Sequence, residues 1–204
     1  MAVPDPWAPL RGLREDLPWD DLGRLADELL RWNRAIRLVG PKTREGVALQ
    51  IADAVLPFLL EAPGFPFLDI GTGPGLPLLP VSLVYRGQRC VGIEPRSRRV
   101  AFVRHAARVL GLPHTEVYEG RAPEILDEAP ELAGAFRAVT LRAVTQPIQA
   151  LELARPFLAP DGRVFLLLGP EPVPDAPGWT RLVHRACPSL PGFGPRALAV
   201  LTPR

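Results

Sequence analysis

Cysteine is scarce in this sequence: Cys90 and Cys187 are the only two, and neither belongs to a Cys-x-x-Cys pair or lies near a histidine cluster. We therefore expect reduced thiols, no metal site and a cytoplasmic protein, because disulfide frameworks and zinc sites need more cysteines at fixed spacings. No apolar run reaches 18 residues, and the amino-terminal segment lacks the apolar stretch of a signal peptide. These absences predict a protein that is neither exported nor inserted in a membrane.

Lysine is nearly absent as well: Lys42 stands alone beside 23 arginines, and the formal net charge is only +2. Such a small net charge does not by itself indicate a nucleic-acid partner. The distribution of charge is less even, because residues 86–108 contain seven arginines and a single acid, Glu94. This local excess of positive charge could attract a phosphate backbone, and a solvated helix face is the alternative interpretation.

Helical periodicity dominates the first part of the chain. The apolar spacing predicts one helix over residues 20–38, capped by Asp20 or Asp21, and another over residues 43–60, capped by Thr43. We expect residues 1–62 to form a helical extension that packs on the remainder, residues 63–204, within one domain overall.

From residue 63 onward, short apolar runs alternate with helical patterns. Strands are predicted at residues 65–70, 89–93, 115–118, 136–141 and 163–168, with helices at 77–85, 97–110, 123–128 and 147–157 between them. This alternation requires parallel pairing through right-handed crossovers, so the predicted fold class is α/β, a doubly wound and mostly parallel sheet. Residues 169–204 begin Pro-rich and contain two more apolar segments, 179–186 and 196–201, which we expect to pair antiparallel at the sheet edge.

A glycine-rich loop follows the first predicted strand, with Gly71, Gly73 and Gly75 in the sequence Gly-Thr-Gly-Pro-Gly-Leu-Pro. Glycines allow the backbone to turn off the strand and to approach a ligand where a Cβ atom would clash. Glu94 lies 23 residues after Gly71 at the end of the second predicted strand, where a carboxylate can bind ribose hydroxyls. Leu76 occupies the place of the third glycine of a dinucleotide fingerprint. The loop and Glu94 together indicate a site for an adenosine-containing ligand. A nicotinamide dinucleotide site and a purely structural turn are the two alternatives.

With these residues in view, the chain resembles the GidB-type bacterial 16S ribosomal RNA guanine-N7 methyltransferases over roughly residues 22–201. The matching segments are Leu29-Leu30-Arg31-Trp32-Asn33, the loop 71–77, Arg98-Arg99-Val100-Ala101-Phe102, Gly120-Arg121-Ala122-Pro123-Glu124 and Arg142-Ala143-Val144. The resemblance implies a class I methyltransferase fold with N-terminal helices, S-adenosyl-L-methionine as cofactor, and ribosomal RNA or the small ribosomal subunit as partner. It also implies a monomer without a metal.

The same resemblance implies a role for individual residues. Gly71, Gly73, Gly75 and Leu76 would hold the methionine part of the cofactor, Glu94 the ribose, and Ala122 and Pro123 the adenine. Arg142 would face the reacting centre as the catalytic residue, and a structural salt bridge is the alternative for this arginine. Arg96, Arg98 and Arg99 are the candidate RNA contacts.

Guanine N7 carries a lone pair and no proton, so its methylation requires in-line positioning rather than a general base. The sequence agrees, since it lacks the Asn-Pro-Pro-Tyr motif of exocyclic-amine methylases. It retains Asp53 but departs from the family pattern elsewhere: Leu49-Gln50 replaces Arg-His, Arg37 an asparagine, Leu168 a lysine and Pro123 a glutamate. Two further functions therefore stay open, a methyltransferase with another acceptor and a cofactor-binding protein that docks on RNA or ribosomes without catalysis.

Overall fold

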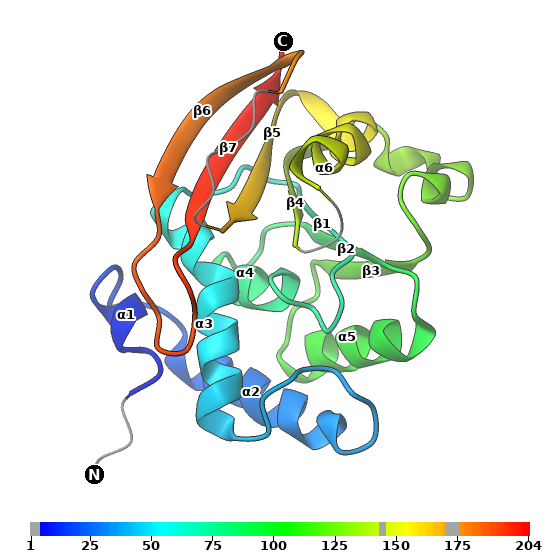
Figure 1. The fold of residues 1–204 in the computed structure, drawn as a ribbon. Coiled ribbons are helices and arrows are strands. Elements are labelled where there is room, and N and C mark those ends of the chain that lie inside the picture. The colour runs from blue at the N-terminus through cyan, green and yellow to red at the C-terminus, as the bar shows by residue number, and fades with distance from the viewer. Residues whose placement is uncertain (1–4, 143–145, 170–175) are drawn as a thin grey trace.

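A seven-stranded sheet of order β3-β2-β1-β4-β5-β7-β6 lies at the centre of the protein, with helices on both of its faces (Figure 1). The computed structural model describes residues 5–142, 146–169 and 176–204. The strands are β1 (Phe67–Ile70), β2 (Cys90–Glu94), β3 (Thr115–Glu119), β4 (Phe136–Leu141), β5 (Leu158–Leu168), β6 (Trp179–Ala186) and β7 (Ala197–Pro203).

Strands β1 to β5 pair in parallel, whereas β7 pairs antiparallel with both β5 and β6. The predictions of a doubly wound sheet and of an antiparallel pair at its edge are therefore confirmed. Every residue of β1 and β2 is buried, as expected for central strands that helices cover on both faces. Strand β5 begins earlier than predicted, because Leu158 already pairs with Phe136 before an irregularity, after which Arg163 pairs with Ala138.

Two buried clusters occupy the two faces of the sheet, since successive strand residues point to opposite sides. Phe67, Cys90 and Ala138 face one cluster, and their neighbours Leu68, Val91 and Val139 face the other. The helices are α1 (Ala8–Arg11), α2 (Trp19–Asn33), α3 (Arg44–Leu60), α4 (Leu78–Val84), α5 (Ser97–Val109) and α6 (Pro147–Ala154). Helices α1 to α5 cover the first cluster, and α6 with three short 3-10 helices, Glu124–Asp127, Pro130–Leu132 and Arg155–Phe157, covers the second. In the part of the chain that the structure describes, no helix is both long and apolar enough to cross a membrane.

Helix α2 ends at Asn33, earlier than the predicted limit at residue 38, because the Asn33 side chain pairs with the backbone that follows. Its Oδ1 accepts hydrogen bonds from the backbone N–H groups of Leu38 at 2.8 Å and Val39 at 3.1 Å. Its Nδ2 donates to the carbonyl oxygens of Val39 at 3.0 Å and Pro41 at 3.4 Å. These bonds fold residues 34–42, here called the 34–42 loop, back against the helix end.

The two predicted helix caps have different outcomes. At α2 the prediction is wrong: the residue before the helix is Pro18, no side chain caps the first turn, and Asp20 and Asp21 lie inside that turn. Their carboxylates still lie near the positive end of the helix dipole. At α3 the prediction is confirmed, since Thr43 Oγ1 accepts a hydrogen bond from the backbone N–H of Gly46 at 3.1 Å.

Candidate cofactor site

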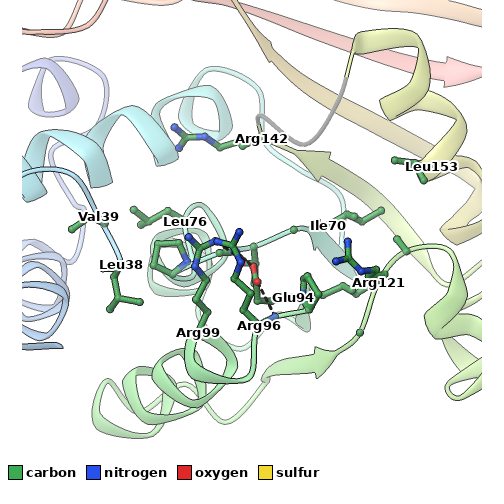
Figure 2. A pocket seen from close by; sticks show the side chains of 18 of the residues that line it. Leu38, Val39, Ile70, Leu76, Glu94, Arg96, Arg99, Arg121, Arg142 and Leu153 are labelled. Carbon is green, nitrogen blue, oxygen red and sulfur yellow. Dashed lines mark hydrogen bonds and ion pairs between the residues drawn. The ribbon is translucent and has the colours of Figure 1, made fainter. Parts of the chain in front are cut away.

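A cavity of about 620 Å³ opens at the carboxyl ends of the parallel strands (Figure 2). Its walls come from the 34–42 loop, α3, α6 and the loops that follow β1, β2, β3 and β4. In the strand order, the chain proceeds from β1 to β2 and β3 on one side and from β4 to β5 on the other. Ligands of open α/β sheets bind at such a switch point, so the topology itself marks this cavity as the candidate site.

The glycine loop between β1 and α4 forms one wall, and its glycines serve different purposes. Gly73 lines the cavity with φ +60°, and a Cβ atom added there would meet nothing closer than Arg99 Nη1 at 3.6 Å. At Gly75, with φ +78°, a Cβ atom would lie 2.5 Å from Leu79 Cδ1. Gly73 therefore leaves space for a ligand, whereas Gly75 allows the loop to pack closely on α4.

Glu94, the last residue of β2, holds its carboxylate beside that loop although only 3% of the residue is exposed. Its Oε2 accepts a hydrogen bond from the backbone N–H of Gly73 at 2.9 Å, and its Oε1 accepts one from the backbone N–H of Arg96 at 3.0 Å. Arg99 Nη1 lies 3.8 Å away. Each carboxylate oxygen can accept more than one hydrogen bond, so both can also accept from the hydroxyls of a ribose.

Arg142 directly follows β4 and lines the cavity from the opposite wall, with its guanidinium turned toward α3 (Figure 2). Its Nη2 donates to Oδ2 of Asp53 at 2.8 Å, and Asp53 itself is only 2% exposed. Arg196, which precedes β7, lies 3.6 Å from the other oxygen of Asp53. Arg142 Nη1 is buried and has no hydrogen-bond partner among the residues that the structure describes. Arg142 thus forms the structural salt bridge, and a second nitrogen of its guanidinium is left without a partner in the described structure.

Two polar groups of this region escaped the sequence interpretation. Asp69 in β1 is 1% exposed; its Oδ2 accepts from the backbone N–H of Leu78 at 3.3 Å, and its Oδ1 has no partner within the described ranges. Gln50 on α3 lines the cavity, and its buried Oε1 likewise has no partner there. Two features of the sequence could have indicated them. Asp69 is an acid inside an apolar strand directly before the glycine loop, and Gln50 stands at the place of a family histidine.

The stability of the protein should depend on the ionisation of Asp69. Burial raises the pKa of this carboxyl to about 7, against the opposing effects of the nearby Thr72 hydroxyl and the Arg142 charge. The folded state therefore keeps the proton up to near neutral pH, whereas the unfolded chain releases it near pH 4. We expect this group to lower the free energy of unfolding by at most about 4 kcal/mol as the pH rises from 4 to 7. Urea denaturation of the wild type and Asp69→Asn over this range measures the effect, and parallel pH profiles would contradict it.

The doubly wound sheet, with the glycine loop and Glu94 beside a cavity at its switch point, is the arrangement of a class I S-adenosyl-L-methionine-dependent methyltransferase. Solved structures share the fold. MtNAS in complex with MTA and tNA superposes with a TM-score of 0.59 at 17% identity, over 91% of this chain and 70% of that one. TrmN from Thermus thermophilus gives a TM-score of 0.55 at 22% identity, over 77% of this chain and 48% of that one.

The family follows from sequence comparison. The family model described as "rRNA small subunit methyltransferase G" (GidB) matches residues 19–176. A protein of Wolinella succinogenes named "Ribosomal RNA small subunit methyltransferase G" is 34% identical over 75% of this chain and 79% of its own length. A protein of the same name from Polynucleobacter asymbioticus is 34% identical over 72% of this chain and 68% of its own. The chain belongs to the GidB family, as the sequence motifs predicted.

The cavity brings most of the expected site residues together. Of the residues assigned to the cofactor, the cavity is lined by Gly71, Gly73, Leu76, Glu94, Ala122 and Arg142, but not by Gly75 or Pro123. Of the candidate RNA contacts, Arg96 and Arg99 line it and Arg98 does not. Ala143 and Val144 of the family signature lie outside the described residues. Within the described ranges, no three His, Cys, Asp or Glu side chains form a group that could hold a metal ion.

Proposed function

We propose that the protein transfers a methyl group from S-adenosyl-L-methionine to N7 of a guanine in 16S ribosomal RNA. The names of its relatives supply the ribosomal RNA of the small subunit as the substrate class. The observation that favours N7 is the side-chain chemistry of the cavity. Its described lining contains no histidine, lysine, cysteine or tyrosine, and both oxygens of Glu94 already accept backbone hydrogen bonds. An acceptor without a proton to remove suits such a site.

The residues of the cavity then act by binding and orientation. The cofactor, when bound, supplies an electrophilic methyl group on a positively charged sulfur. The Gly71–Gly73 backbone would lie against its methionine part, and Glu94 would accept hydrogen bonds from its ribose. Arg142 lines the cavity, and its guanidinium would donate to the methionine carboxylate or to the O6 edge of the guanine, since a guanidinium suits both acceptors.

Mass spectrometry of nucleosides from 16S ribosomal RNA tests this function. A strain that lacks the protein should lose one 7-methylguanosine, and the wild-type gene should restore it. Loss of a different methylated nucleoside would show another acceptor, which is the first alternative. Unchanged nucleosides, together with binding of the cofactor and of small subunits, would favour the docking protein without catalysis.

The arginine-rich stretch of residues 86–108 contributes to the RNA surface only in part. Arg86 forms an ion pair with Asp21 at 2.6 Å, and Arg89 forms one with Glu116 at 3.2 Å. Arg98 is exposed on the first turn of α5 and has no ion pair among the described residues. Arg98 is therefore the better candidate for a phosphate contact.

Replacing Arg98 by glutamine should weaken the salt dependence of RNA binding. Loss of one phosphate contact reduces the slope of log K against log salt by about 0.7 to 0.9, because fewer counterions are released. Filter binding of a 16S ribosomal RNA fragment at several salt concentrations measures this slope. Arg86→Gln, which removes an arginine already paired with Asp21, is the matched control and should change the slope less. Equal slopes for Arg98→Gln and the wild type would remove this residue from the RNA surface.

We also propose that residues 1–62 and 63–204 act together as one domain, as a monomer in the cytoplasm. In support, Leu25 and Leu29 of α2 and Val55 of α3 belong to the same buried cluster as Phe67 and Phe165 of the sheet. Cutting the helical extension from the sheet would expose this cluster to water, at a large cost in stability.

A further inference from the structure

A second depression, an open groove of about 740 Å³, lies beside the cofactor cavity at the end of α2. The 34–42 loop forms most of it, and Arg34, Arg37 and Lys42 line it; we call it the basic groove. Val39 and Gly40 line both the basic groove and the cofactor cavity, so the two spaces are adjacent and share a wall. Figure 2 shows Leu38 and Val39 of this loop at the edge of the cavity.

The three cations of the basic groove differ from most arginines of this protein. Arg31 and Arg44, which flank the loop in sequence, both form ion pairs, with Glu28 and Asp27 respectively. The exposed side chains of Arg34, Arg37 and Lys42 have no acidic partner among the described residues. Residues 34–42 contain no Asp or Glu at all. Three uncompensated positive charges around one groove create a potential that attracts an anion.

The loop that carries these cations is fixed in place before any partner binds. The Asn33 side chain makes hydrogen bonds to the backbone of Leu38, Val39 and Pro41. Leu38 and Val39 are also anchored in the core, with 6% and 7% of their surfaces exposed. A partner therefore loses little loop entropy on binding, which favours affinity.

We propose that the basic groove binds successive phosphates of the RNA strand whose guanine enters the cofactor cavity. This inference rests on the proposed function, because it requires an RNA acceptor. The position of the groove directly beside the cavity favours RNA over an acidic protein, since the strand that delivers the base must pass the cavity mouth. Arg96 and Arg121 line the cavity and also lack acidic partners within the described ranges, so positive charge continues from the groove inward.

The test compares two triple variants that remove the same charge. The groove variant is Arg34→Gln, Arg37→Gln, Lys42→Gln. The control variant is Arg108→Gln, Arg181→Gln, Arg204→Gln, whose arginines are exposed and unpaired among the described residues but lie on the end of α5, on β6 and at the carboxyl terminus. Binding of a protein-free 16S ribosomal RNA fragment and of intact small subunits is measured against salt, beside single-turnover methylation and calorimetry with S-adenosyl-L-methionine.

We expect the groove variant to bind the RNA fragment at least roughly tenfold more weakly, with a salt slope smaller by about 2, as for three lost phosphate contacts. Its cofactor affinity and its methylation rate at saturating subunits should equal those of the wild type, and the control variant should bind within about twofold of the wild type. An unchanged RNA affinity and an unchanged salt slope for the groove variant would overturn the inference while leaving the proposed function in place.

Three other outcomes are distinguishable. Weaker binding to intact subunits but not to the protein-free fragment would show that a ribosomal protein occupies the groove, and would overturn the RNA assignment. Failure of the wild type to bind or methylate RNA would overturn the proposed function and this inference together.

If thermal melting shows that the groove variant is unfolded, Lys42→Gln alone replaces it. Lys42 has no hydrogen bond or ion pair in the described structure, and its loss should reduce the slope by about 0.7 to 0.9.

Discussion

Replacing Gly73 by valine is expected to abolish binding of S-adenosyl-L-methionine, with a loss of affinity of roughly a hundredfold or more, close to 3 kcal/mol. The nearest atoms to a Cβ at this position are Arg99 Nη1 at 3.6 Å and the carbonyl oxygen of Gly71 at 3.9 Å. The added side chain would therefore enter space that the protein leaves open toward the cavity. The Gly73 backbone also donates to Glu94 at 2.9 Å, so a shift of the loop would disturb the carboxylate as well.

The backbone conformation of Gly73 requires a matched control. With φ at +60°, a β-branched side chain strains the backbone whatever the space around it, at a cost of about 1–3 kcal/mol. Gly111 has φ +65° and no atom within 4 Å of an added Cβ, and it lies after α5, outside the cavity lining. Gly111→Val should lose a similar amount of stability and keep the wild-type affinity for the cofactor. Calorimetry gives the cofactor affinity of each variant and thermal melting gives its stability. A wild-type affinity for Gly73→Val would show that its side chain does not enter the space of the cofactor.

Arg142→Lys is expected to lower methyl transfer by about a hundredfold while most of the stability remains. A lysine can keep a positive charge near Asp53, but it cannot reproduce a planar fork that pairs with Asp53 through one nitrogen and has another left to donate, as the proposed ligand role requires. Arg142→Ala removes both functions. Asp53, which is 2% exposed, would then keep Arg196 at 3.6 Å as its one ion-pair partner among the described residues, so a destabilisation of about 3 kcal/mol is expected as well.

Arg196→Ala separates the two roles of the Asp53 cluster. Arg196 contacts Asp53 from the side of β7 and does not line the cofactor cavity. Its loss should lower the melting temperature but leave the rate per folded molecule unchanged. Single-turnover methylation of small subunits, measured beside thermal melting, compares the three variants. A wild-type rate for Arg142→Lys would make Arg142 a purely structural residue.

The parts of the fold that depend on local pattern could be predicted from the sequence. The apolar runs of β1 and β2 predict buried parallel strands. The observed limits of β4, Phe136–Leu141, are the same as the predicted ones. The glycine loop and Glu94 could also be recognised from the sequence, because the residues that define them lie at short, characteristic spacings. The end of α2 was not, since the pattern of apolar residues continues to Ile36 while Asn33 diverts the backbone through its own side chain.

Contacts between distant segments explain the rest of the site. Asp53 and Arg142 are 89 positions apart, and no periodicity in the sequence joins them. The raised pKa of Asp69 results from burial beneath α4 and the glycine loop, a property of the packed molecule rather than of the strand. From the sequence, Gln50 could be noted only as a residue that replaces a histidine of the family. That it lines the cavity follows from the position of α3 in the fold.

The hydrogen bonds of Asn33 have a consequence for how this surface can diversify. All four join the amide to backbone atoms, so the path of the 34–42 loop does not depend on which side chains the loop carries. Leu38 and Val39 are buried and Ile36 packs partly against the core, whereas the exposed side chains of Arg34, Arg37 and Lys42 can change in charge and size. Point substitutions at these exposed positions can therefore change the charge of this surface during evolution or engineering, while the backbone path of the loop and its cavity-lining residues stay the same.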